Sequence, residues 1–182
     1  MKAYLDYNLL CGIAKQDTEQ EELDTLEKIR EHYKAGRLDL RISQVHHREL
    51  EPYGDLKKKE NIKQLLSDFM EVPIVEDSEL QGFNIQWDYR GGFISSPRME
   101  DDPICRDLRQ IPLKRRDAHH LMVAARAGCD AFLTCDKRTI LNRREEIERQ
   151  LSGIQQIRLM KPSAFVKKVT LDETGKVIWS AP

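Results

Sequence analysis

Short apolar segments alternate with longer amphipathic segments along most of the chain, and this alternation is the strongest constraint on its fold. The short apolar segments, which we expect to be strands, are 1–10, 38–42, 72–75, 131–135 and 154–160. The amphipathic segments, which we expect to be helices, are 19–34, 43–51, 56–70, 116–128, 143–151 and 162–166. Strands that alternate with helices favour a mainly parallel sheet with helices packed on it. The sequence therefore predicts an α/β protein, a three-layer α/β/α sandwich.

Two segments depart from this alternation. Segment 81–112 is rich in glycine, proline and aromatic residues, so we expect a long ordered loop inserted into the domain. Segment 169–180 contains the turn residues Glu173, Thr174 and Gly175 between apolar residues, which predicts a C-terminal hairpin. Because no linker-like tract interrupts the 182 residues, we expect one domain over 1–182.

Composition excludes several classes of protein. Hydrophobic residues make up 40% of the chain and no apolar run is long enough to cross a membrane. Asp6 and Asn8 interrupt the first apolar segment, so it does not resemble a signal peptide. The net charge is −1, so any affinity for nucleic acid must come from local basic patches. The four cysteines form no paired motif, and we expect free thiols in a soluble cytoplasmic protein.

Acidic residues stand where an α/β protein usually carries its chemistry. Asp6 lies in the first apolar segment, Asp136 follows 131–135, Asp117 begins a helix, and Glu49 lies on the helix after the second strand. Ligands of parallel sheets bind beyond the carboxyl ends of the strands. Carboxylates that converge there repel one another unless cations or protons neutralise them. Hard divalent cations with oxygen ligands, Mg²⁺ or Mn²⁺, suit such a cluster.

Four short motifs resemble those of PIN-domain nucleases, and most of all the VapC-type toxins and their relatives. They are Leu5-Asp6-Tyr7-Asn8, Glu49-Leu50, Asp117-Ala118-His119-His120-Leu121 and Leu133-Thr134-Cys135-Asp136, in the order found in that family. Segment 157–165 is also similar to the last strand and helix of that group. The resemblance spans roughly Met1 to Val169. Segment 81–112 is longer than the corresponding connection in the family, and the C-terminal hairpin is additional.

The resemblance implies a PIN-like fold and metal-dependent endoribonuclease activity. It assigns catalytic and metal-binding roles to Asp6, Glu49, Asp117 and Asp136, with Mg²⁺ or Mn²⁺ as the cofactor. Asn8 and Thr134 match supporting polar positions. Asn8 would orient Asp6 or a metal-bound water, and Thr134 would orient Asp136. The implied partner is an RNA substrate. A role in a toxin–antitoxin pair, a protein antitoxin or inhibitor, and a homodimer are also compatible with the resemblance.

Basic and aromatic residues near these motifs are candidates for contact with RNA. Arg115 and Arg116 precede the third acid and would border the acidic cleft, so we expect one of them to contact RNA phosphates. Trp87, Tyr89 and Phe93 could stack on unpaired bases or pack on the domain. The usual behaviour of large aromatic residues favours packing.

Two other interpretations remain open. A PIN-like module without catalytic activity would bind RNA or protein, with segment 81–112 covering the cleft or docking a protein partner. A phosphatase with Asp6 as nucleophile would usually carry a second Asp two residues later, where this chain has Asn8. The neighbouring histidines at 46–47 and 119–120 do not favour zinc, because adjacent helical residues point in different directions.

Overall fold

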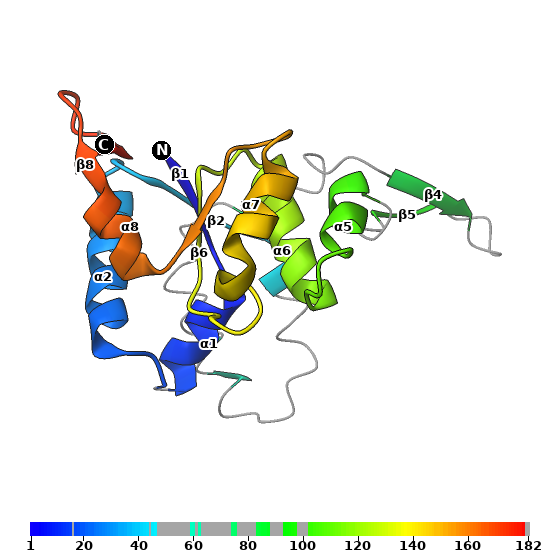
Figure 1. Ribbon diagram of the computed structural model, residues 1–182, viewed down its shortest axis with the longest axis horizontal. Helices are drawn as coiled ribbons and strands as arrows, with labels where there is room; N and C mark the ends of the chain where they lie inside the picture. The colour runs from blue at the N-terminus through cyan, green and yellow to red at the C-terminus, as the bar shows by residue number, and fades with distance from the viewer. Residues whose placement is uncertain are drawn as a thin grey trace.

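A five-stranded sheet forms the centre of the computed structural model (Figure 1). Its strands are β1 (Lys2–Leu5), β2 (Asp39–Ser43), β3 (Ile74–Val75), β6 (Ala131–Leu133) and β7 (Arg158–Met160). They lie in the order β3-β2-β1-β6-β7 and all pair in parallel. The structure describes residues 1–15, 17–43, 45–46, 59–60, 62, 74–75, 83–87, 93–97 and 102–180.

The strand order creates a topological switch beside β1. The chain passes from β1 to β2 and β3 on one side, and later forms β6 and β7 on the other side. Leu5 at the end of β1 pairs with Leu133 at the end of β6. Connections leave two such strands in opposite directions, which opens a crevice at their carboxyl ends. The fold therefore places a binding crevice next to the ends of β1 and β6.

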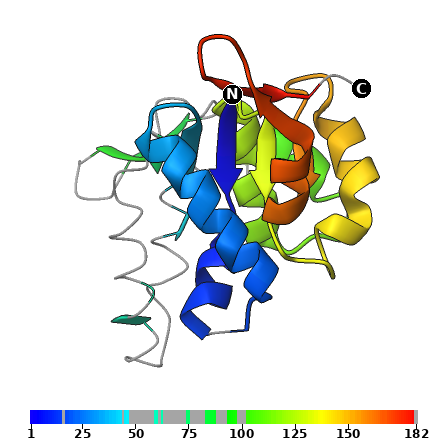
Figure 2. The same cartoon turned by 90° about the vertical axis from the view of Figure 1, so that its left-hand side faces the viewer.

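Helices cover both faces of the sheet, which confirms the predicted three-layer α/β/α sandwich (Figures 1 and 2). One outer layer contains α2 (Gln20–Lys34) and α8 (Pro162–Lys168). The other contains α5 (Pro103–Leu108), α6 (Arg115–Arg126) and α7 (Arg144–Leu151), with the short 3₁₀ helix η3 (Leu141–Arg143) before α7. Helix α1 (Tyr7–Lys15) lies at the lower edge in both views, where β1 ends. No helix in the described part of the chain is long and apolar enough to cross a membrane.

Alternate residues of the strands supply two separate cores. Tyr4, Phe132 and Leu159 belong to the core on the side of α5, α6 and α7. The next residue of each strand, Leu5, Leu133 and Met160, belongs to the core on the side of α1, α2 and α8. A strand buried on both faces needs consecutive apolar residues, because neither face meets water. This requirement explains why β6 is the uninterrupted run Ala131–Leu133, which is buried throughout.

The first strand is shorter than the sequence predicts. Segment 1–10 is expected to be one strand, but β1 ends at Leu5 and α1 begins at Tyr7. The backbone N–H of Leu9 donates to the carbonyl oxygen of Asp6 at 3.1 Å, which begins the helical turn. A short apolar run fits a buried strand and a buried helix equally well, so its periodicity did not reveal the boundary. Asp6 therefore lies at a strand–helix junction rather than inside a strand.

The last strand of the sheet is also shorter than predicted. The sequence predicts a strand over 154–160, whereas β7 begins at Arg158. The backbone N–H of Ile154 donates to the carbonyl oxygen of Leu151 at 2.9 Å, which prolongs the end of α7 as a turn. The helices predicted at 43–51 and 56–70 lie mostly outside the described residues.

Segment 81–112, predicted as a loop, contains regular structure. Strands β4 (Phe83–Trp87) and β5 (Phe93–Pro97) form an antiparallel hairpin in which Trp87 pairs with Phe93. Their side chains, and residue Tyr89, lie outside the described part of the structure, so the expectation of stacking or packing stays untested. Figure 1 shows this hairpin projecting beyond α5.

Segment 81–112 also contains helix α5, which the sequence did not predict. Asp102 caps the helix by accepting the N–H of Ile104 at 2.8 Å, and Pro103 occupies the first helical position. An acidic cap followed by proline is a common helix start, but we interpreted the proline as a loop residue. Cys105 and Leu108 are buried in the core, so α5 belongs to the outer layer.

The predicted C-terminal hairpin is confirmed as β8 (Val169–Leu171) and β9 (Val177–Trp179). Gly175 in the connecting turn has a φ of 75°, a conformation that favours glycine. The N–H of Val177 donates to the carbonyl oxygen of Arg37 at 2.9 Å, just before β2 begins. The hairpin is therefore attached at the amino-terminal edge of the sheet.

Candidate functional site

Three of the four predicted acidic residues lie in the described part of the chain. Asp6 directly follows β1, Asp136 lies shortly after β6, and Asp117 lies in the first turn of α6. Glu49, the fourth predicted acid, lies outside the described residues. Asp6 and Asp136 thus follow the carboxyl ends of two adjacent strands at the topological switch, where ligands of parallel sheets are expected to bind.

Thr134 connects Asp6 with Asp136. Its hydroxyl donates to Oδ2 of Asp6 at 2.5 Å and accepts the backbone N–H of Asp136 at 3.0 Å. The backbone N–H of Asp6 also donates to the carbonyl oxygen of Leu133 at 3.0 Å. Both Asp6 and Thr134 are buried. The hydroxyl of Thr134 therefore orients the carboxylate of Asp6, and it contacts only the backbone of Asp136.

Thr139, a residue that the sequence motifs do not include, connects the other two acids. Its hydroxyl oxygen lies 2.6 Å from Oδ2 of Asp136 and 3.0 Å from Oδ2 of Asp117. Its backbone N–H donates to Oδ1 of Asp136 at 2.9 Å. A hydroxyl carries one proton and can donate it to only one of the two carboxylates at a time. A local signal existed, because an Asp side chain often accepts the N–H of a residue shortly after it.

The three acidic residues thus belong to one hydrogen-bonded chain. It runs from the Asp6 carboxylate through Thr134 to the backbone of Asp136, and from the Asp136 carboxylate through Thr139 to Asp117. No group of three or more His, Cys, Asp or Glu residues in the described part of the chain is placed to hold one metal ion. A hydrated Mg²⁺ ion, however, needs only one or two carboxylates, because it keeps several water ligands. A pair of carboxylates within hydrogen-bond distance of one hydroxyl can meet that need.

A pocket of about 430 Å³ opens at this edge of the sheet. Asp136 and Asn8 are among its lining residues, so one predicted acid and one predicted supporting residue face the same space. Asp6 and Asp117 are not among them, and they connect to the pocket through the two threonines. Gly12 in α1 also lines the pocket, and a Cβ atom at this position would collide with Oγ1 of Thr18.

Basic side chains surround the acids in this pocket. Lys114, Lys137, Arg138 and Lys161 all line it. Burial alone would raise the pKa of Asp136, but hydrogen bonds from Thr139 and the charge of Lys114 hold that pKa below its ordinary value. Asp136 is therefore an ionised carboxylate at neutral pH, available to a cation or to a hydrogen-bond donor.

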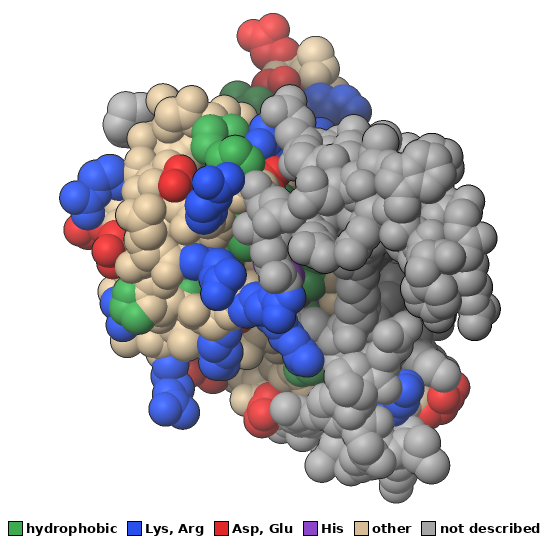
Figure 3. Space-filling view, turned by 90° about the vertical axis from the view of Figure 1, so that its right-hand side faces the viewer, with side chains coloured by type: hydrophobic (Ala, Val, Ile, Leu, Met, Phe, Trp, Pro, Cys, Tyr) green, Lys and Arg blue, Asp and Glu red, His purple; other side chains and the backbone are tan. Residues whose placement is uncertain are grey.

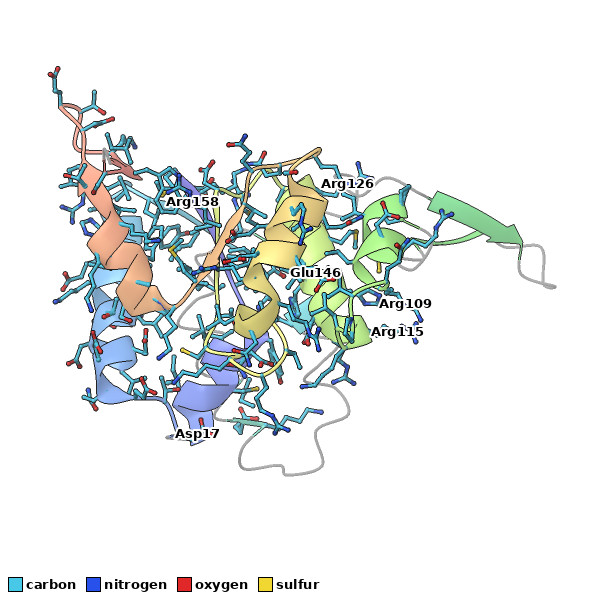
Figure 4. The ribbon with its side chains drawn as sticks, in the orientation of Figure 1. Asp17, Arg109, Arg115, Arg126, Glu146 and Arg158 are labelled. Carbon is cyan, nitrogen blue, oxygen red and sulfur yellow. The ribbon has the colours of Figure 1, made fainter. Side chains whose placement is uncertain are left out.

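The predicted RNA-contact residues are exposed, and the residue directly before them lines the pocket. Arg115 and Arg116 lie in the first turn of α6 and are exposed, whereas Lys114 lines the pocket. Figure 4 places Arg115 and Arg109 near the junction of α5 and α6. Figure 3 shows that Lys and Arg side chains gather on the face to which these helices contribute. The basic run Lys114-Arg115-Arg116, which directly precedes Asp117 in the sequence, therefore begins in the pocket and continues onto the exposed start of α6.

Two buried histidines support the end of β1. His46 follows β2, and its Nε2 lies 2.9 Å from the carbonyl oxygen of Leu5, to which it donates. His120 on α6 lies beside it, with ring centroids 4.7 Å apart, and its Nδ1 is 2.8 Å from the hydroxyl oxygen of Tyr4. Burial lowers the pKa of His120 to about 3, so this ring is neutral at physiological pH. His46 thus fixes the backbone immediately before Asp6.

Comparison with known proteins adds no relative. No protein-family model, curated protein or solved structure matches the chain. The function of this protein must therefore be inferred from the geometry of the site and from the resemblance of its motifs to PIN-domain nucleases.

Proposed function

We propose that this protein is a metal-dependent endoribonuclease that hydrolyses RNA phosphodiester bonds at the acidic site beside β1 and β6. The observation that carries the proposal is the hydrogen-bonded chain from Asp6 to Asp117. It links three acidic residues at the topological switch of the sheet, and the carboxylates of Asp117 and Asp136 both lie within hydrogen-bond distance of the Thr139 hydroxyl. Such an arrangement keeps like charges close together, which favours a cationic cofactor.

Asp117 and Asp136 are the residues that would hold Mg²⁺ or Mn²⁺, with waters completing the coordination. When bound, the metal would polarise the phosphodiester and lower the pKa of an attacking water. Thr139 lies within hydrogen-bond distance of both carboxylates and would fix their orientation. Asp6 is buried and held by Thr134, so it would contribute negative charge and orientation from behind the pocket. Glu49 remains the fourth acid of the proposal, on the strength of the motif alone.

A polynucleotide substrate is proposed because cations border the acids, and RNA is the polynucleotide that the resemblance to PIN-domain nucleases implies. Lys114 lines the pocket, and the exposed Arg115 and Arg116 continue outward from it along α6. Cationic side chains in this position would bind the phosphates on either side of the scissile bond and would position the strand. Affinity from such contacts falls as the salt concentration rises.

Asp6→Asn is the first test of the proposal. The amide oxygen can still accept the hydrogen bond from Thr134, so the fold should persist while negative charge is lost. We expect RNA cleavage in Mn²⁺ to fall about a hundredfold or more, as for loss of one stabilising group in a catalytic site. Cleavage of a labelled single-stranded RNA, followed by gel electrophoresis, measures the effect.

Asp24→Asn is the matched control for this experiment. Asp24 is exposed on α2 and accepts a hydrogen bond from Gln20, away from the pocket lining. The control should cleave RNA at the wild-type rate. Equal cleavage by the Asp6 and Asp24 variants, or cleavage that persists in EDTA, would refute the assignment.

One observation favours a second function, a PIN-like module that binds RNA or protein without cleaving it. The described residues contain no group of three side chains placed to hold one metal ion. Tight RNA binding without cleavage in saturating Mn²⁺ would support this alternative. A phosphatase with Asp6 as nucleophile is less favoured, because Asp6 is buried and does not line the pocket.

A further inference from the structure

Glu19 places a carboxylate between two lysines of the same pocket. Oε1 of Glu19 lies 3.2 Å from Nζ of Lys137, and Oε2 lies 3.0 Å from Nζ of Lys161. All three residues line the pocket that contains Asp136. We propose that Lys137 and Lys161 bind a second phosphate of the RNA strand, and that the Glu19 carboxylate occupies this position when RNA is absent. This inference rests on the proposed function and specifies how its substrate is held.

The chemistry of the two anions matches. A carboxylate and a phosphodiester each carry one negative charge shared by two free oxygens, and each can accept from two ammonium groups at once. Lys137 directly follows Asp136, so a phosphate held there would belong to the strand that passes the acids. The site would therefore select a polynucleotide over a single nucleotide.

One lysine of the pair is held in place independently of Glu19. Nζ of Lys161 also lies 3.2 Å from Oε1 of Glu22, which is almost fully buried. Glu22 in turn accepts the backbone N–H of Ser163 at 2.9 Å and its hydroxyl at 2.7 Å. Hydrogen bonds to Glu19 and Glu22 raise the pKa of Lys161, so it is cationic throughout the physiological range. If Glu19 moves away, Glu22 still positions Lys161 for another anion.

Glu19, in contrast, is easy to displace. Its side chain is 60% exposed, it directly precedes α2, and it makes no side-chain capping hydrogen bond there. Exposed ion pairs contribute little free energy, because water and salt compete with them. A phosphate of a strand already bound at the acids competes intramolecularly, which gives it a large effective concentration.

The balance of charges around the pocket also supports the proposal. Its described lining includes four acidic residues, Asp17, Glu19, Glu22 and Asp136, and four basic residues, Lys114, Lys137, Arg138 and Lys161. Figure 4 shows Asp17 at the lower edge of the molecule, below α1. Removal of the Glu19 charge leaves an excess of positive charge, which attracts phosphate.

Glu19→Gln tests the proposal, with Glu21→Gln as its control. Glu21 forms an ion pair with Lys167 at 3.0 Å, is 63% exposed, and does not line the pocket. The two variants change the net charge equally, so general attraction to RNA is matched. Binding of a fluorescein-labelled single-stranded RNA is measured by anisotropy in EDTA, which prevents metal-dependent cleavage. We expect Glu19→Gln to bind about threefold to tenfold more tightly than Glu21→Gln, the effect of releasing one or two exposed ion pairs.

Lys137→Gln identifies the residue through which Glu19 acts. Lys137 is 61% exposed, so this change should leave the fold intact. It should weaken RNA binding and reduce the slope of log affinity against log salt by about 0.7, the value for one contact to a single strand. In the double variant the gain from Glu19→Gln should shrink, because the two residues act on one site.

Each outcome has a defined meaning. Equal binding by the Glu19 and Glu21 variants, or weaker binding by the Glu19 variant, overturns the inference while leaving the nuclease proposal intact. If no variant binds RNA in EDTA, pyrophosphate becomes the probe of the phosphate site, and the nuclease proposal is judged separately by cleavage in Mn²⁺. A rise in Tm with pyrophosphate that is larger for Glu19→Gln than for Glu21→Gln would retain the phosphate site alone. No difference between them would overturn that as well.

Discussion

The hydroxyl of Thr139 lies between two carboxylates of the site and can donate its proton to one of them at a time. It lies within hydrogen-bond distance of Asp117 and Asp136, which belong to different elements and carry the same charge. Its backbone N–H also donates to Asp136, so one residue contacts both oxygens of that carboxylate. Hydrogen bonds to a carboxylate stabilise its ionised form and lower its pKa.

Thr139→Val should therefore raise the pKa of Asp136. The valine is isosteric but cannot donate, so it removes the side-chain hydrogen bond that lowers the pKa of Asp136 in the wild type. Carbon-detected NMR titration of the metal-free protein measures the shift. Thr139→Ser keeps the hydroxyl and should titrate close to the wild type. An unchanged pKa in the valine variant would contradict this account of the site.

The same change has a defined pH dependence. A carboxyl whose folded pKa is depressed adds stability above its unfolded pKa, and that stability is lost as pH falls through the folded pKa. The difference in unfolding free energy between wild type and Thr139→Val should thus be largest at neutral pH and should shrink in acid. Urea unfolding at a series of pH values follows it.

The residues of the site divide into those visible from the sequence and those that depend on folding. Asp6 and Asp136 could be predicted because acids at the carboxyl ends of parallel strands converge at one edge. Glu19 and Lys161 could not, because their contact joins residues separated by 142 positions. His46 was missed for the same reason, since its contact with Leu5 spans 41 positions.

At the scale of the elements, Glu22 joins α2 to α8. Its buried carboxylate accepts two hydrogen bonds from Ser163 and faces Lys161, so three donors replace the water it loses. A buried acid on an amphipathic helix usually indicates such a partner, because an unpaired buried charge is costly. Nothing in the local sequence distinguishes Glu22 from the exposed Glu21 beside it.

Glu22→Ala should lower the free energy of unfolding by about 3 kcal/mol, because it breaks a buried charged network. Glu21→Ala removes only an exposed ion pair with Lys167 and should cost less than about 1 kcal/mol. Urea denaturation followed by circular dichroism gives both values. Similar losses of unfolding free energy in the two variants would mean that the hydrogen bonds between Glu22 and Ser163 contribute little to the packing of α2 against α8.

The boundaries of elements were less predictable than their existence. Strand β1 and helix α1 share one apolar run. The backbone hydrogen bond from the N–H of Leu9 to the carbonyl oxygen of Asp6 marks where the helix begins. Helix α5 was interpreted as part of a loop because Pro103 was counted as a breaker, although proline suits the first turn of a helix. By contrast, α2 and α6 carry apolar residues at helical spacing over several turns, and both were predicted.

At the scale of the whole molecule, the layered architecture follows from the alternation of segments. Each central strand needs apolar residues on both faces, and each covering helix needs them on one face. The alternation of strands and helices can therefore be predicted from local sequence alone. The order of the strands in the sheet cannot be predicted in this way, because it depends on the side of β1 to which the chain returns. The location of the pocket depends on that order.

Metal binding should stabilise the entire fold. The acids follow β1 and β6 or lie in α6, so an ion that neutralises them favours the folded state over the unfolded chain. Mn²⁺ at about a hundredfold above its dissociation constant should raise Tm by roughly 5–10 °C. EDTA should reverse the shift, and Asp136→Asn should respond less. A wild-type Tm that does not change on addition of Mn²⁺ would count against a metal site.

The placement of the C-terminal hairpin has a practical consequence. Strand β9 and the start of β1 both lie at the edge of the sheet where the strands begin, whereas the pocket lies where they finish (Figure 1). Immobilisation on a biosensor surface through a tag at either end would therefore leave the pocket directed toward the flowing analyte. A bulky fusion partner at those positions should likewise spare oligonucleotide access.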